Sequence, residues 1–308
     1  MYDGTCAIFR LPYRYPEMLK KLGIPCKMFA PIRPMISTHY NNRDHRKILV
    51  IDGKVAYTGG VNLADEYINR GSRCRCGHWK DVSLRLEGEA VRSFTLMFLQ
   101  MWNVDESGDD FARYLDPPAA VSIQGAPGWV LPYGDSPLDT EKVGEMMYVD
   151  VLSRARRYVH IMTPYLILDG EMLTSLTFAA KRGVEVEIIL PHIPDKKYAF
   201  ALAKTHYREL LEAGVRIFEY TPGFVHAKAF VSDDCKAIVG TINLDWRSLY
   251  LHFECAAYLR DMPAVMDVEK DFIETRAKCQ EIKMEDLKDI KLSYRITGWL
   301  LKVFAPVM

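Results

Sequence analysis

The second half of the chain alternates between two hydrophobic patterns. In one, apolar positions recur every three or four residues, which predicts amphipathic helices. The other is a short run of apolar, often β-branched residues, which predicts a buried strand. In chain order these segments are Val143–Arg156 (helix), Tyr158–Met162 (strand), Gly170–Lys181 (helix), Val184–Leu190 (strand), Ala199–Ala213 (helix) and Val215–Glu219 (strand). This alternation predicts an α/β fold with a largely parallel sheet that helices cover on both faces.

The first half repeats only the end of this series. Pro16–Leu22 followed by a glycine matches the end of the helix Ala199–Ala213, and Pro25–Phe29 matches the strand Val215–Glu219. Nothing in the first half corresponds to Val143–Ile188. We therefore expect two related repeats, of which the first lacks roughly one helix–strand–helix–strand set.

Residues 1–118 and residues 119–308 are accordingly predicted to form two domains of ordinary size. They would meet around Tyr114–Trp129, a segment whose prolines and glycines indicate a linker or loop. We interpret Met1 as an internal start, in a truncated product or a fragment. A genuinely minimal first domain is the alternative.

Two further segments have helical character. Glu87–Trp102 is predicted to form an amphipathic helix whose aromatic and methionine stripe packs in the core. Tyr294–Met308 combines apolar residues with Arg295 and Lys302, a composition that allows a helix at a membrane interface. Docking of this segment on the second domain is an equally good interpretation.

One short motif occurs twice, in each case with the form H-x-K-x-x-x-x-D. The first copy contains His45, Lys47 and Asp52, and the second contains His226, Lys228 and Asp233. Each continues with a glycine seven residues after the aspartate and an asparagine ten residues after it, namely Gly59 and Asn62 in the first copy and Gly240 and Asn243 in the second. Incidental histidines and lysines would not explain these matching offsets.

The local pattern around each motif is a hairpin. Apolar runs follow each lysine and lead into Asp52-Gly53 or Asp233-Asp234, which are turn sequences. Residues two apart on a strand face the same way, so each histidine and its lysine would share a face. The two aspartates fall in the turns and are interpreted as supporting residues. The glycines after the return strands would leave room for a bulky anion.

An imidazole, an ammonium and an amide on one surface suit a phosphate group. Two such sets predict a clamp around one phosphodiester. One neutral histidine could attack phosphorus while the other, protonated, donates to the leaving oxygen. His45, Lys47, Asn62, His226, Lys228 and Asn243 are therefore the candidate catalytic residues.

Composition narrows the function. The 40 basic and 40 acidic residues give no net charge, which weakly opposes a dedicated nucleic-acid binder. The seven cysteines are odd in number and scattered, which fits reduced thiols better than a disulfide framework. No apolar run approaches about 18 residues, so no transmembrane helix is expected.

At these motifs the chain resembles the phospholipase D superfamily, and more closely the bacterial cardiolipin synthases. The resemblance covers nearly the whole chain and rests on Arg43–Lys47, Gly59–Asn62, Trp79–Asp81, Thr163–Tyr165, Pro222–Lys228 and Asn243–Ser248. It implies two mixed, mostly parallel sheets flanked by helices and related by a pseudo-twofold axis, with the site between them. The N-terminal membrane helices of those enzymes have no counterpart in this chain.

The resemblance also implies a reaction that needs no metal or cofactor. Phosphatidylglycerol would be donor and acceptor, giving cardiolipin and glycerol through a phosphohistidine, at the anionic surface of a bacterial cell membrane. In the family a carboxylate past each motif orients the catalytic imidazole, and Asp81 and Glu254 match those positions. By analogy His45 is the nucleophile and His226 the acid/base, with Asp52, Asp81, Asp233 and Glu254 supporting them.

Several alternatives remain open from sequence. Water could replace the lipid acceptor, which would make the chain a phospholipase. DNA is a less favoured substrate, and an inactive lipid-binding fragment is a further alternative. Outside the motifs, His192 and Tyr165 follow strand ends, where they could face a substrate, whereas His160 in an apolar strand is predicted to be a core residue. The sequence does not indicate an oligomeric state.

Overall fold

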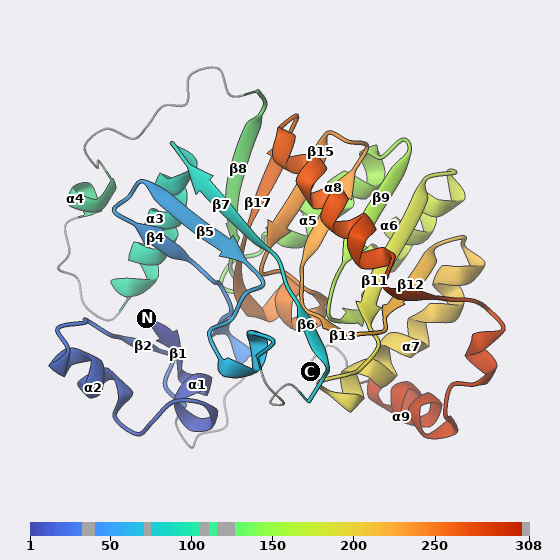
Figure 1. Ribbon diagram of the computed structural model, residues 1–308, viewed down its shortest axis with the longest axis horizontal. Helices are drawn as coiled ribbons and strands as arrows, with labels where there is room; N and C mark the ends of the chain where they lie inside the picture. The colour runs from blue at the N-terminus through green and yellow to red at the C-terminus, as the bar shows by residue number, and fades with distance from the viewer. Residues whose placement is uncertain (33–40, 71–74, 105–110, 116–126, 304–308) are drawn as a thin grey trace.

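The computed structural model describes residues 1–32, 41–70, 75–104, 111–115 and 127–303 of the 308-residue chain. The predicted linker prolines, the boundary between residues 118 and 119, and the apolar C-terminal residues 304–308 lie outside these ranges. In Figure 1 the first-half elements β1, β2, β4 and β5 lie on one side of the molecule and β9, β11, β12 and α7 on the other, with β8 and β17 between them, whereas β6 of the first half lies beside β13.

A large mixed sheet forms the centre of the second half. Within the described residues it has nine strands, eight of them in the order β18-β12-β11-β9-β14-β15-β17-β3, with β8 also paired to β17. The strands from the second half are β8 (Trp129–Asp135), β9 (Tyr158–Met162), β11 (Glu185–Pro191), β12 (Arg216–Tyr220), β14 (Ala229–Ser232), β15 (Lys236–Gly240), β17 (His252–Arg260) and β18 (Cys279–Ile282). Strands β9, β11 and β12 are mutually parallel, as the alternation with helices predicts. The two strands of the motif hairpin, β14 and β15, join this parallel part through antiparallel pairs.

Helices cover both faces of the sheet, and the bounds of the first three agree closely with the predicted helices, whereas α8 was not predicted. They are α5 (Val143–Arg154), α6 (Gly170–Lys181), α7 (Lys197–Glu212) and α8 (Pro263–Arg276). Side chains from α5, α6 and α7 pack with Ile161, Ile188 and Ile238 on one face. Side chains from α8 pack with Val231 and Leu259 on the other. The predicted core position of His160 is confirmed, since this residue is buried on β9.

The first half is smaller. Its described elements are β1 (Tyr2–Asp3), α1 (Gly4–Phe9), α2 (Tyr15–Lys21), β2 (Met28–Phe29), β3 (Arg43–Asp44), β4 (Leu49–Ile51), β5 (Val55–Gly59), β6 (His78–Lys80), β7 (Ser83–Glu87), α3 (Ala90–Trp102) and α4 (Phe111–Leu115). Strands β1 and β2 pair in parallel, like β11 and β12. Strands β4, β5 and β7 form an antiparallel sheet against which α3 packs. The predicted helix Glu87–Trp102 begins at Ala90, because Glu87 still belongs to β7.

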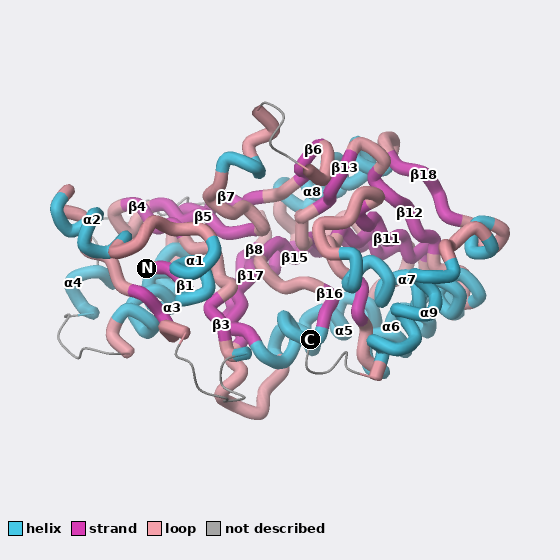
Figure 2. Tube along the Cα trace, turned by 90° about the horizontal axis from the view of Figure 1, so that it is seen from below, coloured by secondary structure: helices cyan, strands magenta, loops and turns pink. Residues whose placement is uncertain are grey.

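Backbone pairs and an ion pair between Lys80 and Asp271 help to join the two halves. Strand β3 of the first half pairs in parallel with the start of β17. Strand β6 pairs in parallel with β13 (Gly223–Val225), which directly precedes the second motif. The ammonium of Lys80 on β6 lies 2.7 Å from the carboxylate of Asp271 on α8. Figure 2 shows β3 beside β17, and β6 beside β13, in the middle of the molecule.

The C-terminal part folds onto the second half. Short elements β10 (Leu166–Ile167) and β16 (Leu244–Asp245) pair in parallel, and a π-helical turn, η3 (Arg247–Leu251), leads into β17. Helix α9 (Leu292–Lys302) packs on α7, where Leu301 contacts a small apolar cluster. Docking on the second half, one of the two interpretations of this segment, is thus confirmed. None of the helices in the described part of the chain is long and apolar enough to cross a membrane.

Candidate active site

The two motif histidines lie where the halves join. His45 directly follows β3, and its backbone N–H donates to the carbonyl of Phe253 on β17 at 3.0 Å. His226 directly follows β13, and its N–H donates to the carbonyl of Lys80 on β6 at 2.7 Å. The inter-half strand pairs therefore continue into both histidines. Each histidine is held by backbone of the opposite half.

The carboxylates that orient the histidines are also exchanged between the halves. His45 Nδ1 donates to Glu254 Oε1 at 2.8 Å, and Glu254 is completely buried on β17. His226 Nδ1 donates to Asp81 Oδ2 at 2.8 Å, and Asp81 follows β6. Asp81 and Glu254 are thus brought to the site as predicted. Each serves the histidine of the other repeat, a pairing that the sequence interpretation left unspecified.

The ammonium group of each motif lysine contacts the backbone of its own histidine. Lys47 Nζ donates to the carbonyl of His45 at 2.6 Å, and Lys228 Nζ donates to the carbonyl of His226 at 2.6 Å. Lys228 is only 1% exposed, and burial lowers its pKa to about 7. Burial also lowers the pKa of Lys47. The positive charge of Lys47 further lowers the pKa of both Lys228 and His226, so the two sets act on each other within one cluster.

Burial dominates the protonation of the histidines. It lowers the pKa of His45 to about 3 and that of His226 to about 4, against the pull of their carboxylates. Burial alone would raise the pKa of Glu254, but its interactions with His45 and His252 lower it. Each ring is therefore neutral near pH 7, with its proton on Nδ1 toward a carboxylate. That tautomer leaves the lone pair on Nε2, as a nucleophile or general base requires.

The two asparagines differ in their surroundings. Asn243 is buried in the loop after β15, and its Oδ1 has no hydrogen-bond partner among the described residues. Asn62 is half-buried in the loop after β5. A buried amide oxygen without a partner is costly. A bound hydrogen-bond donor would therefore stabilise Asn243 more than Asn62, because it would satisfy the buried Oδ1.

The motif aspartates are turn residues, as predicted. Both adopt a left-handed backbone, with φ of 53° at Asp52 and 55° at Asp233. The carboxylate of Asp233 accepts hydrogen bonds from the backbone N–H groups of three consecutive residues, Arg156, Arg157 and Tyr158. Asp233 thus ties the hairpin to the start of β9, whereas Asp52 is exposed. Neither forms a hydrogen bond to a catalytic candidate.

The glycines after the return strands do not leave open space. A Cβ atom at Gly60 would lie 2.1 Å from Asp81 Oδ1 and 2.7 Å from the His226 carbonyl oxygen. At Gly240, it would lie 2.3 Å from the Cβ of Ala256. Room for an anion was therefore the wrong interpretation of these residues. Their small size lets protein atoms, including the Asp81 carboxylate, approach closely.

Sequence reasoning missed several neighbours of the histidines. Thr241 Oγ1 donates to the second oxygen of Glu254. The indole of Trp79 lies 4.9 Å from the His226 ring and stacks on Phe224 at 4.7 Å. The ring of His252 lies 5.5 Å from that of His45. His252 and Glu254 are two residues apart on β17, a spacing that places both on one face and could have indicated the contact.

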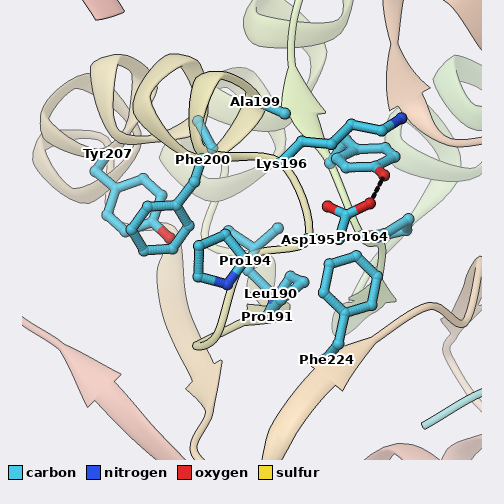
Figure 3. Close-up of a pocket in the computed structure, with 12 residues that line it drawn as sticks. Pro164, Leu190, Pro191, Pro194, Asp195, Lys196, Ala199, Phe200, Tyr207 and Phe224 are labelled. Atoms are coloured by element: carbon cyan, nitrogen blue, oxygen red, sulfur yellow. Dashed lines mark hydrogen bonds between the residues drawn. The ribbon is translucent and has the colours of Figure 1, made fainter. Parts of the chain in front are cut away.

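A pocket adjoins this aromatic stack. It lies at the ends of β9 and β11 beside α7, with Phe224 on one side and Phe200 and Tyr207 on the other (Figure 3). Tyr165 lines the pocket and donates to Asp195 at 2.6 Å. His192 is absent from the lining; its Nδ1 lies 3.1 Å from the buried carboxylate of Glu219.

The chain is similar to known proteins over its whole length. Residues 148–276 match the family described as "Cardiolipin synthase, PLD-like domain". The chain is 34% identical over 311 residues to a cardiolipin synthase of Halalkalibacterium halodurans and 55% identical over 308 residues to an uncharacterised protein of Streptococcus mutans. A crystal structure of phosphatidylserine synthase from Haemophilus influenzae superposes with a TM-score of 0.70 at 16% identity, covering 99% of this chain and 82% of that one. The fold and the paired motifs are those of the phospholipase D superfamily.

Residues 148–276 thus match that phospholipase D-like domain, and the whole chain is similar in sequence to cardiolipin synthases. Both sequence relatives align with the whole of this chain, which spans 66% of the Streptococcus protein and 61% of the Halalkalibacterium enzyme.

Proposed function

We propose that this chain carries the phosphatidyl-transfer site of a cardiolipin synthase. The observation that supports the proposal best is the crossed pair of hydrogen bonds, His45 to Glu254 and His226 to Asp81. Each bond presents an unprotonated Nε2, and both come from the junction of the two halves. Such a pair can serve as nucleophile and acid/base on one phosphodiester.

In the first step, Nε2 of His45 attacks the phosphorus of phosphatidylglycerol. When the anionic substrate binds, Nε2 of His226 takes up a proton from water. The bond from phosphorus to the head-group glycerol oxygen then breaks, and that oxygen takes this proton from Nε2 of His226. In the second step, His226 removes a proton from the terminal hydroxyl of a second phosphatidylglycerol. The resulting oxygen attacks phosphorus, and the bond from phosphorus to His45 breaks. Cardiolipin is released and both rings regain their starting protonation.

The lowered pKa of His226 places a demand on the first step, because this ring must be protonated to act as an acid. The negative phosphodiester supplies the compensating charge, since a nearby anion favours the imidazolium. Lys47 and Lys228 stabilise the negative charge that grows on the phosphoryl oxygens. Amide groups of Asn62 and Asn243 add donors to the same oxygens.

The decisive experiment is incubation of the purified chain with vesicles of labelled phosphatidylglycerol. Cardiolipin and glycerol are the expected products, whereas phosphatidic acid would show that water is the acceptor. His45→Ala and His226→Ala should each lower turnover by about 10⁴-fold, the range for loss of a nucleophile or its acid/base partner. His192→Ala, at a histidine outside the site, is the matched control. Full turnover in either motif variant would overturn the mechanism.

We also propose that α9 contacts the membrane surface that holds the substrate. The helix and its C-cap carry five exposed apolar residues, namely Leu292, Ile296, Trp299, Leu300 and Val303. Another side of the helix packs on α7, with Gly298 buried there. Residues 290–308 contain Lys291, Arg295 and Lys302 and no acidic residue, which suits an anionic lipid surface.

Replacing Trp299 with serine should therefore weaken sedimentation of the chain with phosphatidylglycerol vesicles by about tenfold, because an exposed aromatic anchor is lost. The matched control is Trp129→Ser, at an exposed tryptophan on β8. Equal losses in the two variants would contradict a specific role for α9.

A further inference from the structure

A third histidine, His252, lies beside the proposed nucleophile, with a ring centroid 5.5 Å from that of His45. His252 begins β17, and its side chain is only 12% exposed. Both of its ring nitrogens are buried and lack hydrogen-bond partners among the described residues. Its Nδ1 lies 3.8 Å from Glu254 Oε1, beyond hydrogen-bonding distance. A buried imidazole left in this state needs a partner that the described part of the chain does not supply.

His252 completes a set of three groups that can ligate a metal. One donor atom each from His45, His252 and Glu254 lies within 4.8 Å of the others. Glu254 Oε1 is 2.8 Å from His45 Nδ1 and 3.8 Å from His252 Nδ1. Zinc bonds of about 2.1 Å in a tetrahedron require donor atoms about 3.4 Å apart. The two observed separations bracket that value, so small side-chain movements would accommodate the ion.

We propose that His45, His252 and Glu254 form a binding site for a zinc-like dication, and that its occupation blocks phosphatidyl transfer. Two histidines and one glutamate with a free fourth position are a known ligand combination for zinc. The inhibitory effect rests on the proposed function, whereas the binding itself does not.

The inhibition follows from the tautomer of His45. In the free site its Nδ1 carries the proton and donates to Glu254, which leaves the lone pair on Nε2. A metal on Nδ1 uses the lone pair of that nitrogen, so the single proton of the neutral ring moves to Nε2. Nε2 then has no lone pair with which to form the bond to phosphorus. Metal and phosphoryl transfer are therefore mutually exclusive at this ring.

The surrounding charges make such a site reversible. Lys47 interacts electrostatically with His45 and would repel a dication, while Glu254 is the only carboxylate in the set. The site therefore suits a regulatory or inhibitory ion better than a permanent structural one.

Two other groups of potential ligands in the described part of the chain already have partners. Glu187, in the group with His160 and Glu185, forms ion pairs with both Arg216 and Arg276. In the group formed by Glu145, Asp169 and Glu171, the hydroxyl of Tyr250 contacts the carboxylates of Glu145 and Asp169. In the group formed by His45, His252 and Glu254, the ring nitrogens of His252 form no hydrogen bond among the described residues, so at least one ligand of this group is free to bind an ion.

The first test is calorimetric titration of the EDTA-treated, lipid-free chain with zinc chloride. One site per chain is expected. His252→Asn should weaken binding by at least about 100-fold, because losing a direct ligand costs more than the ~10–100-fold typical of an outer-shell partner. His192→Asn, which breaks a histidine–glutamate contact elsewhere, should bind zinc like the parent chain. Unchanged affinity in His252→Asn, or no binding by the parent chain at millimolar zinc, would overturn the proposal.

Two measurements guard against a folding defect in the variant. Circular dichroism must match the parent chain, and His252→Gln provides a second substitution of larger volume. The visible absorption of cobalt(II) added to the parent chain reports directly whether nitrogen ligands surround the ion in a four-coordinate site. A purely octahedral aqua-like spectrum would contradict the site without any variant.

The second test measures transfer between phosphatidylglycerol molecules with increasing zinc. Turnover of the parent chain should fall with the affinity measured by calorimetry, and the zinc needed for half-inhibition should rise at least about 100-fold in His252→Asn. Binding without inhibition would overturn the inhibitory role alone. If the chain has no turnover in the absence of zinc, the proposed function fails, while calorimetry still decides whether the metal site exists.

Discussion

The same hairpin occurs in two different environments within this molecule. In the second half, every residue of β14 and β15 is buried, and helices cover both faces of their sheet. In the first half, Leu49 and Ile51 on β4 are exposed, and the small core is completed by Cys255 and Ala257 from β17. The sequence motif is therefore not tied to one level of burial. The second half provides the core, and the first half depends on it for both packing and histidine orientation.

The largest expected effect on activity comes from removing one orienting carboxylate at a time, which tests whether each half depends on the other for the orientation of its histidine. Glu254→Gln should lower phosphatidyl transfer by about 10³–10⁴-fold, because an amide can no longer fix the Nδ1–H tautomer of His45 by charge. Asp81→Asn should act in the same way on His226. Single-turnover assays with phosphatidylglycerol would follow formation of phosphohistidine and its transfer separately.

The two variants should differ in the step they slow. If His45 is the nucleophile, Glu254→Gln impairs formation of the covalent intermediate. Asp81→Asn slows proton transfer in both steps. Retention of normal rates in both variants would show that the crossed hydrogen bonds have no catalytic role.

The difference in burial predicts different effects on stability. Phe230 on β14 is 1% exposed and stacks on Tyr148 at a ring distance of 4.0 Å. Phe230→Ala should lower the free energy of unfolding by about 3–5 kcal/mol through loss of burial and the cavity left behind. Leu49→Ala, on the exposed strand β4, should change it by less than about 0.5 kcal/mol.

Urea denaturation of both variants gives the comparison. Similar losses in the two halves would show that β4 is buried in solution, which would contradict the described difference.

The free energy of unfolding should begin to fall at a higher pH than protonation of ordinary carboxylates would cause, because a buried neutral histidine is involved. The pKa of His226 is lowered to about 4 by burial, below its ordinary value of 6.5. Between about pH 6.5 and pH 4, the His226 ring is therefore protonated in the unfolded chain but neutral in the folded chain. The corresponding stability is fully present above pH 6.5 and is lost as the pH falls through this window, at a cost on the order of 3 kcal/mol.

His226→Gln should flatten this part of the pH dependence, measured by urea denaturation at several pH values. A parent chain whose stability is constant from pH 7 to 4 would contradict a buried neutral ring. His192→Gln, at an exposed histidine, serves as the control.

Local patterns predicted most of the second half because nearly all of its strands are buried on both faces. The bounds of Tyr158–Met162 and Gly170–Lys181 agree residue for residue with β9 and α6. The paired motifs also identified His45 and His226, whose backbone N–H groups bond to the opposite half. These successes depend on periodicities within short segments, where the pattern and the burial coincide.

Sequence reasoning could not specify contacts between distant segments. The two crossed hydrogen bonds join residues that are 209 and 145 positions apart. The pairing depends on the contacts of β17 with β3 and of β6 with β13, which join the two halves. No local sequence pattern predicts these contacts. For the same reason Gly60 was taken as space for substrate, although the Asp81 carboxylate fills it. That the ring nitrogens of His252 are buried and form no hydrogen bond among the described residues could likewise be seen only from the structure around them.

The exchange of carboxylates means that neither repeat is a self-sufficient unit. A lone copy of the repeat would contain a histidine without its orienting acid and an acid without its histidine. Two identical copies related by a twofold axis would restore both contacts at once. The single chain is thus arranged like a dimer whose two subunits are covalently linked. Loss of the carboxylate in one repeat therefore first affects the orientation of the histidine in the other repeat.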